Sequence, residues 1–199
     1  MNKKDILIVS ALEQETQGQL EDYRVLYTGV GKVNATLELT KVLQKAHLHY
    51  MPPMPKLVIN YGTAGSRKSP IGELVDCTKF IQRDMDVTGL GFMKHQTPYE
   101  SPNEMVIRCT SKFNPIGKKM RCGSGDNFVQ DNKEIYSDVF DMEAYALAKV
   151  CHHYKIPFIS FKYITDNANE HSPGDWKDNC SDGIDEFKEK VLSKIKERA

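Results

Sequence analysis

The chain has 199 residues, in which 27 lysines and arginines balance 27 aspartates and glutamates. A chain of this length can bury a sizeable core within one domain, so we expect residues 1–199 to fold as a single domain. The charge balance argues against a nucleic-acid-binding surface or an anionic membrane partner. Because the sequence has neither a long apolar run nor a signal-peptide pattern, we expect a cytoplasmic protein without membrane attachment.

The five cysteines are odd in number and widely spaced, and none forms a C-x-x-C motif. This usage indicates reduced thiols rather than a disulfide framework. His152 and His153 follow Cys151, but adjacent residues of a helix do not face each other, and no second cluster has metal-ligand spacing. We therefore expect no metal and no cofactor.

The first third of the chain alternates strand and helix patterns. Residues 6–9 are apolar and largely β-branched, which predicts a buried strand, and residues 13–21 predict a short helix after it. A strand pattern at 24–32 runs into a glycine turn, and the apolar residues of 33–46 lie mostly on one helical face. A proline-rich segment ends that helix before a buried strand at 56–66, which also ends in a glycine turn.

The remainder continues the alternation. Residues 72–86 alternate in the manner of a strand, whereas residues 88–120 are irregular and hold one candidate strand at 104–109. A strand and turn at 119–126 precede three clearer elements. These are a helix from 142 onward, a buried strand at 156–166 and an amphipathic helix at 184–199. Such alternation implies one α/β domain with a largely parallel central sheet.

Three acidic residues follow or flank the predicted strands. Glu15 follows the first strand, Glu143 opens the long helix, and Asp166 ends the strand after that helix. Because the loops after parallel strands open at one edge of the sheet, these carboxylates are candidates for a common site. A pair of carboxylates is what hydrolysis of a glycosidic bond requires, one to donate a proton and one to activate water. From position alone, helix caps or solvated acids are the more common explanation of such residues.

Seven segments in this order resemble the nucleoside phosphorylase superfamily: "TGVGKVNA", "VINYGTAGS", "GELV", "RDMDVTGLGF", "GSGDNFV", "DMEAYALAKVC" and "IPFISFKYITD". Within that superfamily the chain is most similar to the 5'-methylthioadenosine/S-adenosylhomocysteine nucleosidases, from about residue 6 to residue 170. The resemblance implies a three-layer α/β/α fold around a twisted, largely parallel mixed sheet. It also implies a hydrolase that releases the base of a purine nucleoside.

The resemblance separates a hydrolase from a phosphorylase. Phosphorylases of the superfamily carry a phosphate-binding arginine after the first strand and another before the glycine-threonine turn, as a phosphate dianion requires fixed cations. This chain has "ALEQE" at the first place and Asn60 at the second. An acid at the phosphate position repels phosphate and can deprotonate water. Glu15 is therefore the implied water-activating base, while Glu13 aligns with a non-catalytic acid.

The resemblance assigns roles to the other site residues. Asp166 would protonate or hydrogen-bond N7 of the purine, and Glu143 would accept hydrogen bonds from the ribose hydroxyls. Phe128 would stack on the base. The implied substrate-binding residues are Val30, Thr63, Ala64, Gly65, Phe128, Val129 and Met142. From the residue pattern alone, Phe128 and Met142 could equally be core side chains.

The chain departs from the family at two places, since the regions 16–27 and 100–120 are shorter than usual. Family members form homodimers in which the segment after "DVT" covers the partner's 5' pocket, and we expect a homodimer with residues 88–99 near the interface. Lys94 and His95 in that segment could favour a polar or anionic 5' group. Three alternatives stay open: another nucleoside hydrolase, acting for example on futalosine or inosine; a nucleoside phosphorylase; and a non-catalytic nucleoside-binding protein.

Overall fold

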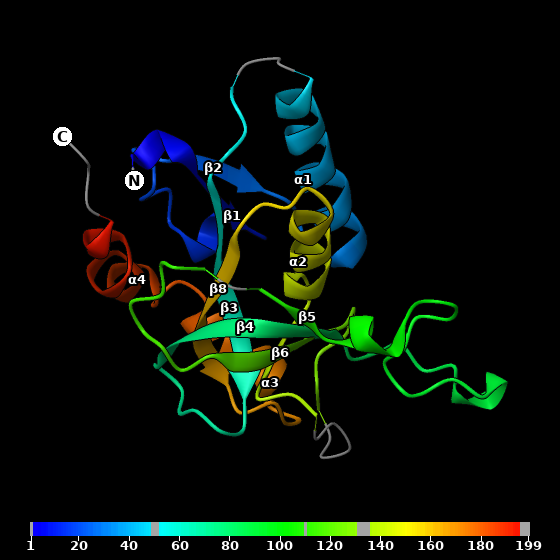
Figure 1. Ribbon diagram of the computed structural model, residues 1–199. Helices are drawn as coiled ribbons and strands as arrows, with labels where there is room; N and C mark the ends of the chain where they lie inside the picture. Colours follow the sequence, from blue (N-terminus) through cyan, green and yellow to red (C-terminus); the bar gives the residue numbers. More distant parts are fainter. Residues whose placement is uncertain (1, 49–51, 110, 131–135, 196–199) are drawn as a thin grey trace.

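The computed structural model describes residues 2–48, 52–109, 111–130 and 136–195 (Figure 1). Its described strands form one eight-stranded mixed sheet. The strands are β1 (Ile6–Ser10), β2 (Arg24–Tyr27), β3 (Leu57–Ser66), β4 (Leu74–Gln82), β5 (Ile107–Arg108), β6 (Met120–Ser124), β7 (Val139–Asp141) and β8 (Phe158–Asp166). The predicted α/β class with a largely parallel, mixed sheet is confirmed.

The sheet closes on itself through strands that the sequence pattern did not fully reveal. β3 runs parallel to both β1 and β8, and β1 runs parallel to β2. β8 pairs antiparallel with β4. β4 pairs in parallel with β6, and β6 pairs in parallel with β7. β7 returns to the end of β3 in antiparallel register. The strands β3, β8, β4, β6 and β7 therefore form a ring, with β1 and β2 extending from β3.

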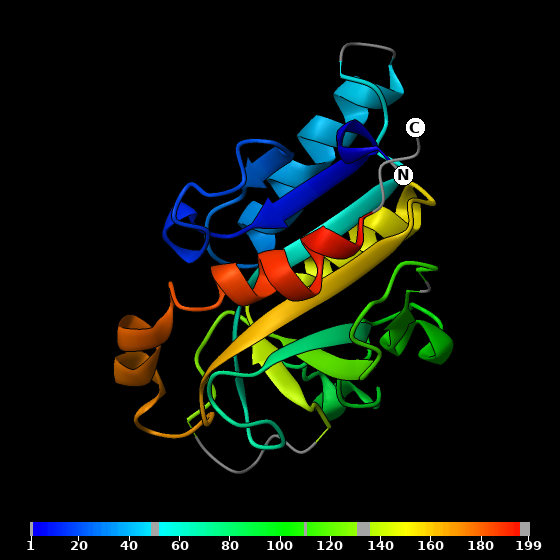
Figure 2. The same cartoon turned by 90° about the vertical axis from the view of Figure 1, so that its left-hand side faces the viewer.

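Helices cover both faces of the sheet (Figure 2). The α-helices are α1 (Lys32–His47), α2 (Ala144–His153), α3 (Ser172–Asn179) and α4 (Ile184–Lys190). The short 3-10 turns are η1 (Lys3–Asp5), η2 (Glu13–Glu15), η3 (Thr88–Leu90), η4 (Pro102–Met105) and η5 (Leu192–Lys194). None of the helices in these described ranges is long and apolar enough to cross a membrane.

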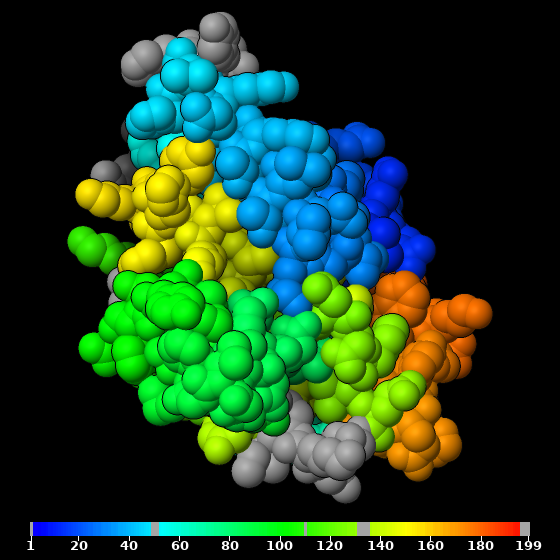
Figure 3. All heavy atoms as spheres, turned by 90° about the vertical axis from the view of Figure 1, so that its right-hand side faces the viewer, coloured from blue at the N-terminus to red at the C-terminus, as the bar shows by residue number. Residues whose placement is uncertain are grey.

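Two hydrophobic clusters hold the layers together. On one face, α1 and α2 pack on the sheet, and α1 contributes Ala35, Leu39 and Leu43 at the four-residue spacing of one helical face. On the other face, α4 inserts Phe187, which stacks on Tyr61 of β3 with ring centroids 4.3 Å apart. α1, α2 and the segment 88–105 share one side of the molecule (Figure 3).

The structure corrects two predicted helices and adds one. Residues 13–21 do not form a helix beyond η2, because the chain turns at Gln17 and Gly18, whose φ angles of 49° and 67° are left-handed. The predicted helix 184–199 consists of α4 and then η5, and residues 196–199 lie outside the described ranges. α3 was not predicted.

Candidate active site

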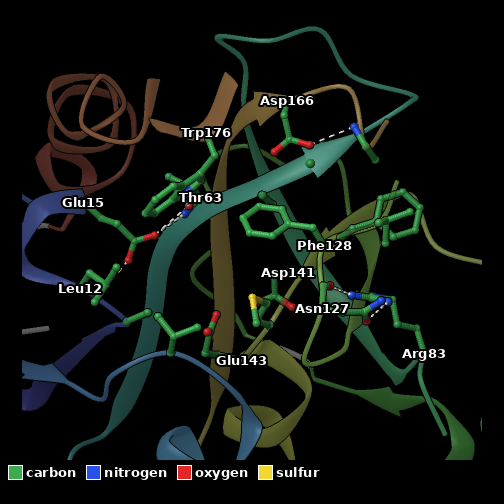
Figure 4. A pocket seen from close by; sticks show the side chains of 18 residues that line it. Leu12, Glu15, Thr63, Arg83, Asn127, Phe128, Asp141, Glu143, Asp166 and Trp176 are labelled. Atoms are coloured by element: carbon green, nitrogen blue, oxygen red, sulfur yellow. Dashed lines mark hydrogen bonds between the residues drawn. The ribbon is translucent and has the colours of Figure 1, made fainter. Parts of the chain in front are cut away.

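A pocket of about 150 Å³ lies where β1, β3 and β8 end and α2 begins (Figure 4). The structure places all ten predicted site residues in its lining, although they come from segments far apart in the sequence. They are Glu15, Val30, Thr63, Ala64, Gly65, Phe128, Val129, Met142, Glu143 and Asp166. The lining also includes residues that the sequence pattern did not single out, among them Arg83, Asn127, Asp141 and Trp176.

Glu15 is held by four hydrogen-bond donors at the end of β1. Its Oε1 accepts from the amide and the hydroxyl of Thr63, both at 2.9 Å. Its Oε2 accepts from the Ser10 hydroxyl at 3.0 Å and from the Leu12 amide at 3.1 Å. A Cβ at Gly62 would come within 3.1 Å of Oε1, so the bare backbone there leaves room for the carboxylate. The side chain is therefore buried and held in place at the pocket.

Asp166 lies at an irregularity between β3 and β8. The strand register shifts between Ala64 and Gly65, so that Gly65 pairs with Asp166. The carboxylate accepts from the Ala168 amide at 2.9 Å and from the Thr165 hydroxyl at 3.1 Å. A Cβ at Gly65 would collide with the carboxylate of Asp166. Glycine at this position therefore allows the acid to lie against the pocket floor.

Glu143 is the N-cap residue of α2 and accepts a 2.8 Å hydrogen bond from the Gly31 amide. Its side chain does not cap its own helix. Burial raises the pKa of Glu143 to about 8, and the neighbouring charge of Asp141 adds to the effect. Lys162 and the Gly31 amide act in the opposite direction. Carboxyl groups whose pKa is raised by desolvation are typical of functional sites.

A buried ion pair beneath Glu143 fixes the start of α2. Lys162 Nζ lies 2.8 Å from Asp141 Oδ2, and both side chains are almost fully buried. Burial alone would raise the pKa of Asp141, but the Lys162 ammonium outweighs it and holds this pKa below its usual range. Asp141 also accepts from the Ala144 amide at 2.8 Å, while Ser124 accepts from the Tyr145 amide at 2.8 Å. These bonds satisfy the first amides of α2.

The segment that carries Phe128 is anchored by a buried arginine. Arg83 Nη1 donates to Asn127 Oδ1 at 3.0 Å, and Nη2 donates to the carbonyls of Gly125 and Asn127. A Cβ at Gly125 would lie 2.7 Å from the guanidinium carbon, so glycine is required for this contact. Phe128 itself is 40% exposed at the pocket, whereas Val129 is buried. The Phe128 ring is thus available to a ligand.

Trp176 reaches the pocket from α3. Its Nε1 donates to Thr63 Oγ1 at 2.9 Å, and its ring lies edge-on to Phe128 with centroids 6.4 Å apart. Sequence reasoning missed it because α3 has no clear apolar periodicity. The available signal was that it is the single tryptophan of the chain, positioned after an acid-terminated strand.

Lys94 and His95 belong to the segment that we expect to cover the 5' pocket of a partner subunit rather than the pocket of their own chain. Lys94 is exposed and His95 is buried, and neither belongs to the pocket lining. Across the described ranges, no group of three or more His, Cys, Asp or Glu side chains could hold a metal ion.

Comparison with known proteins agrees with the geometry of the site. A family model described as the phosphorylase superfamily matches residues 13–198. A 5'-methylthioadenosine/S-adenosylhomocysteine nucleosidase of Shewanella loihica is 30% identical over 201 residues, covering 85% of this chain and 84% of the relative. The enzyme of the same name from Bacillus thuringiensis subsp. konkukian is 30% identical over 178 residues, covering 79% and 74%.

Solved structures share the fold at lower identity. The nucleosidase of this name from Helicobacter pylori, in a mutant form with 5'-methylthioadenosine in its active site, superposes with a TM-score of 0.76. It is 21% identical and the match covers 90% of this chain and 92% of that one. The native futalosine hydrolase of Helicobacter pylori has a TM-score of 0.78 at 19% identity, with 96% and 97% covered. The chain therefore belongs to the phosphorylase superfamily and, within it, to the family of the 5'-methylthioadenosine/S-adenosylhomocysteine nucleosidases.

Proposed function

We propose that this chain is a purine nucleosidase of the methylthioadenosine/S-adenosylhomocysteine type, which uses water to cleave the N-glycosidic bond. The observation that carries the proposal is the position of Glu15. Its carboxylate is held by four donors at the pocket, which also contains Glu143 and Asp166. A fixed anion at this place suits a general base for water and opposes a phosphate dianion.

The cations of the site argue further against a phosphorylase. Of the pocket-lining residues that the structure describes, Arg83 carries the one basic side chain. Its guanidinium is engaged with Gly125 and Asn127. Lys162 lies beneath the pocket lining and is paired with Asp141. Neither cation is arranged as the bidentate partner that a phosphate nucleophile requires.

The proposed mechanism divides the reaction among three carboxyl groups. Asp166 hydrogen-bonds N7 of the purine and transfers its proton there, so that the base leaves as a neutral molecule when the C1'–N9 bond breaks. Glu143 accepts hydrogen bonds from the ribose hydroxyls, and its ionised form stabilises the positive charge that develops on the sugar. Glu15 takes a proton from the attacking water, whose oxygen forms the new bond to C1'. The products are the free base and the free sugar.

The other lining residues would bind the nucleoside. Phe128 stacks on the purine, and the adjoining main chain at Val129 reads the edge of the base. Met142 and Val30 pack against the ribose. Thr63, together with the Ala64 and Gly65 that follow it, lines the ribosyl side near the water. The exposure of Phe128 supports its role, since a stacking ring must be open to the ligand.

Base release from a panel of nucleosides tests this function. The pure protein is incubated with methylthioadenosine, S-adenosylhomocysteine, futalosine and inosine, and free base is measured by chromatography. We expect adenine from the first two substrates. Release only from futalosine or inosine would assign another nucleosidase specificity, and tight binding without any release would indicate a nucleoside-binding protein.

We also propose that the chain acts as a homodimer in the cytoplasm. A groove of about 790 Å³ lies between α1, α2 and Thr97 of the segment 88–105 (Figure 3). Val33 and Leu37 of α1 line this groove and are exposed, and the segment 88–105 also exposes Leu90, Met93 and Tyr99. A two-fold interface would cover such a surface on both subunits at once. The five free cysteines support a reducing compartment.

Light scattering tests the dimer. We expect twice the mass of one 22.6 kDa chain for the wild type. Leu37→Asp should convert it to the single-chain mass, whereas Leu48→Asp, at the far end of α1, should not. A wild-type mass of one chain at working concentration would contradict the proposal.

A further inference from the structure

The pocket contains a chain of two hydrogen bonds that begins at Trp176, which is not one of the three acids, and ends at Glu15. Trp176 Nε1 donates to Thr63 Oγ1 at 2.9 Å, and Thr63 Oγ1 donates to Glu15 Oε1 at 2.9 Å. Figure 4 shows the three side chains side by side, each from a different part of the chain. Trp176 and Glu15 lie far apart in the sequence, so the tertiary fold alone brings them together.

The chemistry of the two ends determines the direction of the middle hydroxyl. An indole N–H can only donate, and an ionised carboxylate can only accept. A threonine hydroxyl between them has one arrangement that satisfies both, with its lone pair toward Trp176 and its proton toward Glu15. A threonine hydroxyl without the indole would be free to rotate and to donate to water or to a ligand instead.

We infer that Trp176 is a positioning residue for Glu15, acting through the Thr63 hydroxyl. The inference rests on the proposed function, in which Glu15 is the base for water. With the hydroxyl fixed, Oε1 keeps both of its Thr63 bonds and the carboxylate keeps one orientation toward the pocket. Precise placement of a reacting group increases the reaction rate, because misplacement by a fraction of an ångström weakens proton transfer.

A simpler role for Trp176 is that of a pocket wall, because its ring lies against Phe128. The two roles can be separated, since phenylalanine keeps an aromatic wall but has no donor. The position of α3 does not depend on the indole N–H alone. Asn179 Nδ2 of α3 donates to the Thr165 carbonyl at 3.1 Å, and Ser172 Oγ accepts from the Asn169 amide at 2.9 Å. Trp176→Phe should therefore leave α3 in place.

Steady-state kinetics of Trp176→Phe, Thr63→Val and the double variant test the inference. Loss of one neutral hydrogen bond corresponds to a factor of about 2 to 12, so we expect kcat of Trp176→Phe to fall about 3- to 10-fold while KM changes less than twofold. Thr63→Val should lower kcat as well, and adding Trp176→Phe to it should have no further effect. In the Thr63→Ser background, which keeps the hydroxyl, Trp176→Phe should again lower kcat. Additive effects, or a rise in KM with kcat unchanged, would overturn the inference and leave Trp176 as a wall.

A second measurement does not depend on catalysis. Because the chain has one tryptophan, a ¹H–¹⁵N spectrum contains a single indole signal. We expect Thr63→Val to shift this proton upfield and to speed its exchange with solvent, whereas Thr63→Ser should leave it close to the wild-type position. An indole signal that Thr63→Val does not move would refute the hydrogen bond itself. If the wild type released no base from any nucleoside but the signal moved as expected, the proposed function would fail while the hydrogen-bond chain stood.

Discussion

Replacing Glu143 by glutamine should make the protein more stable, and increasingly so as the pH rises. Burial and the charge of Asp141 raise the pKa of Glu143 from 4.5 to about 8 in the folded state. A buried group with a raised pKa contributes stability that is complete below the unfolded pKa and is lost as the pH rises to the folded one. Between these values the wild-type side chain is protonated when folded and ionised when unfolded. Glutamine stays neutral in both states and can still accept from the Gly31 amide.

The size of the effect follows from the linkage between protonation and folding. Each pH unit in the window is worth about 1.4 kcal/mol. From pH 5 to pH 7, the stability of Glu143→Gln relative to the wild type should therefore increase by roughly 2–3 kcal/mol. For a chain of this size, that corresponds to a difference in Tm that widens by about 4–12 °C. Above about pH 8 the difference should level off, because both states of the wild type are then ionised.

Urea unfolding followed by circular dichroism at half-unit pH intervals measures this difference directly. Glu21→Gln is the control, because Glu21 is exposed. Its difference from the wild type should stay constant over the same pH range. If the free-energy difference between Glu143→Gln and the wild type is also constant from pH 5 to pH 7, Glu143 ionises normally and the electrostatic account of the pocket is wrong.

Three further substitutions probe the remaining charged groups. Asp166→Asn should lower kcat about 10²- to 10⁴-fold with binding retained, because the proton donor is removed; near-normal turnover would exclude Asp166 as the acid. Glu15→Gln should suppress base release to a similar degree, whereas Glu13→Gln, at an exposed position, should not, and equal effects of the two would remove Glu15 from its role. Lys162→Met should lower the free energy of unfolding by about 3–5 kcal/mol, since it leaves Asp141 buried without its cation. An unchanged urea midpoint would contradict the importance of this pair.

The strands that carry the predicted site residues could be derived from the sequence because they are buried apolar runs. β1, β3 and β8 each begin within such a run, and parallel strands in one sheet end at a common edge. The convergence of Glu15 and Asp166 on one pocket follows from that geometry. The resemblance to a known family supplied their roles, which spacing alone left open.

The contacts that position these acids could not be derived in the same way. Lys162 lies in the middle of a buried strand, and its partner Asp141 is distant in sequence, so only the tertiary fold reveals the ion pair. β7 is too short to give a strand pattern, and without it the closure of the sheet is invisible. Trp176 lies on a helix of eight residues that begins Ser-Pro-Gly, which reads as a turn.

The choice between water and phosphate as the nucleophile is the most direct test of the account. The enzyme is supplied with methylthioadenosine in buffer that contains excess inorganic phosphate, and the sugar product is separated and assayed for bound phosphate. With Glu15 as the base for water, we expect free methylthioribose, formed at the same rate when phosphate is left out. A sugar 1-phosphate as the product, with no reaction in phosphate-free buffer, would contradict the assignment of this chain as a hydrolase.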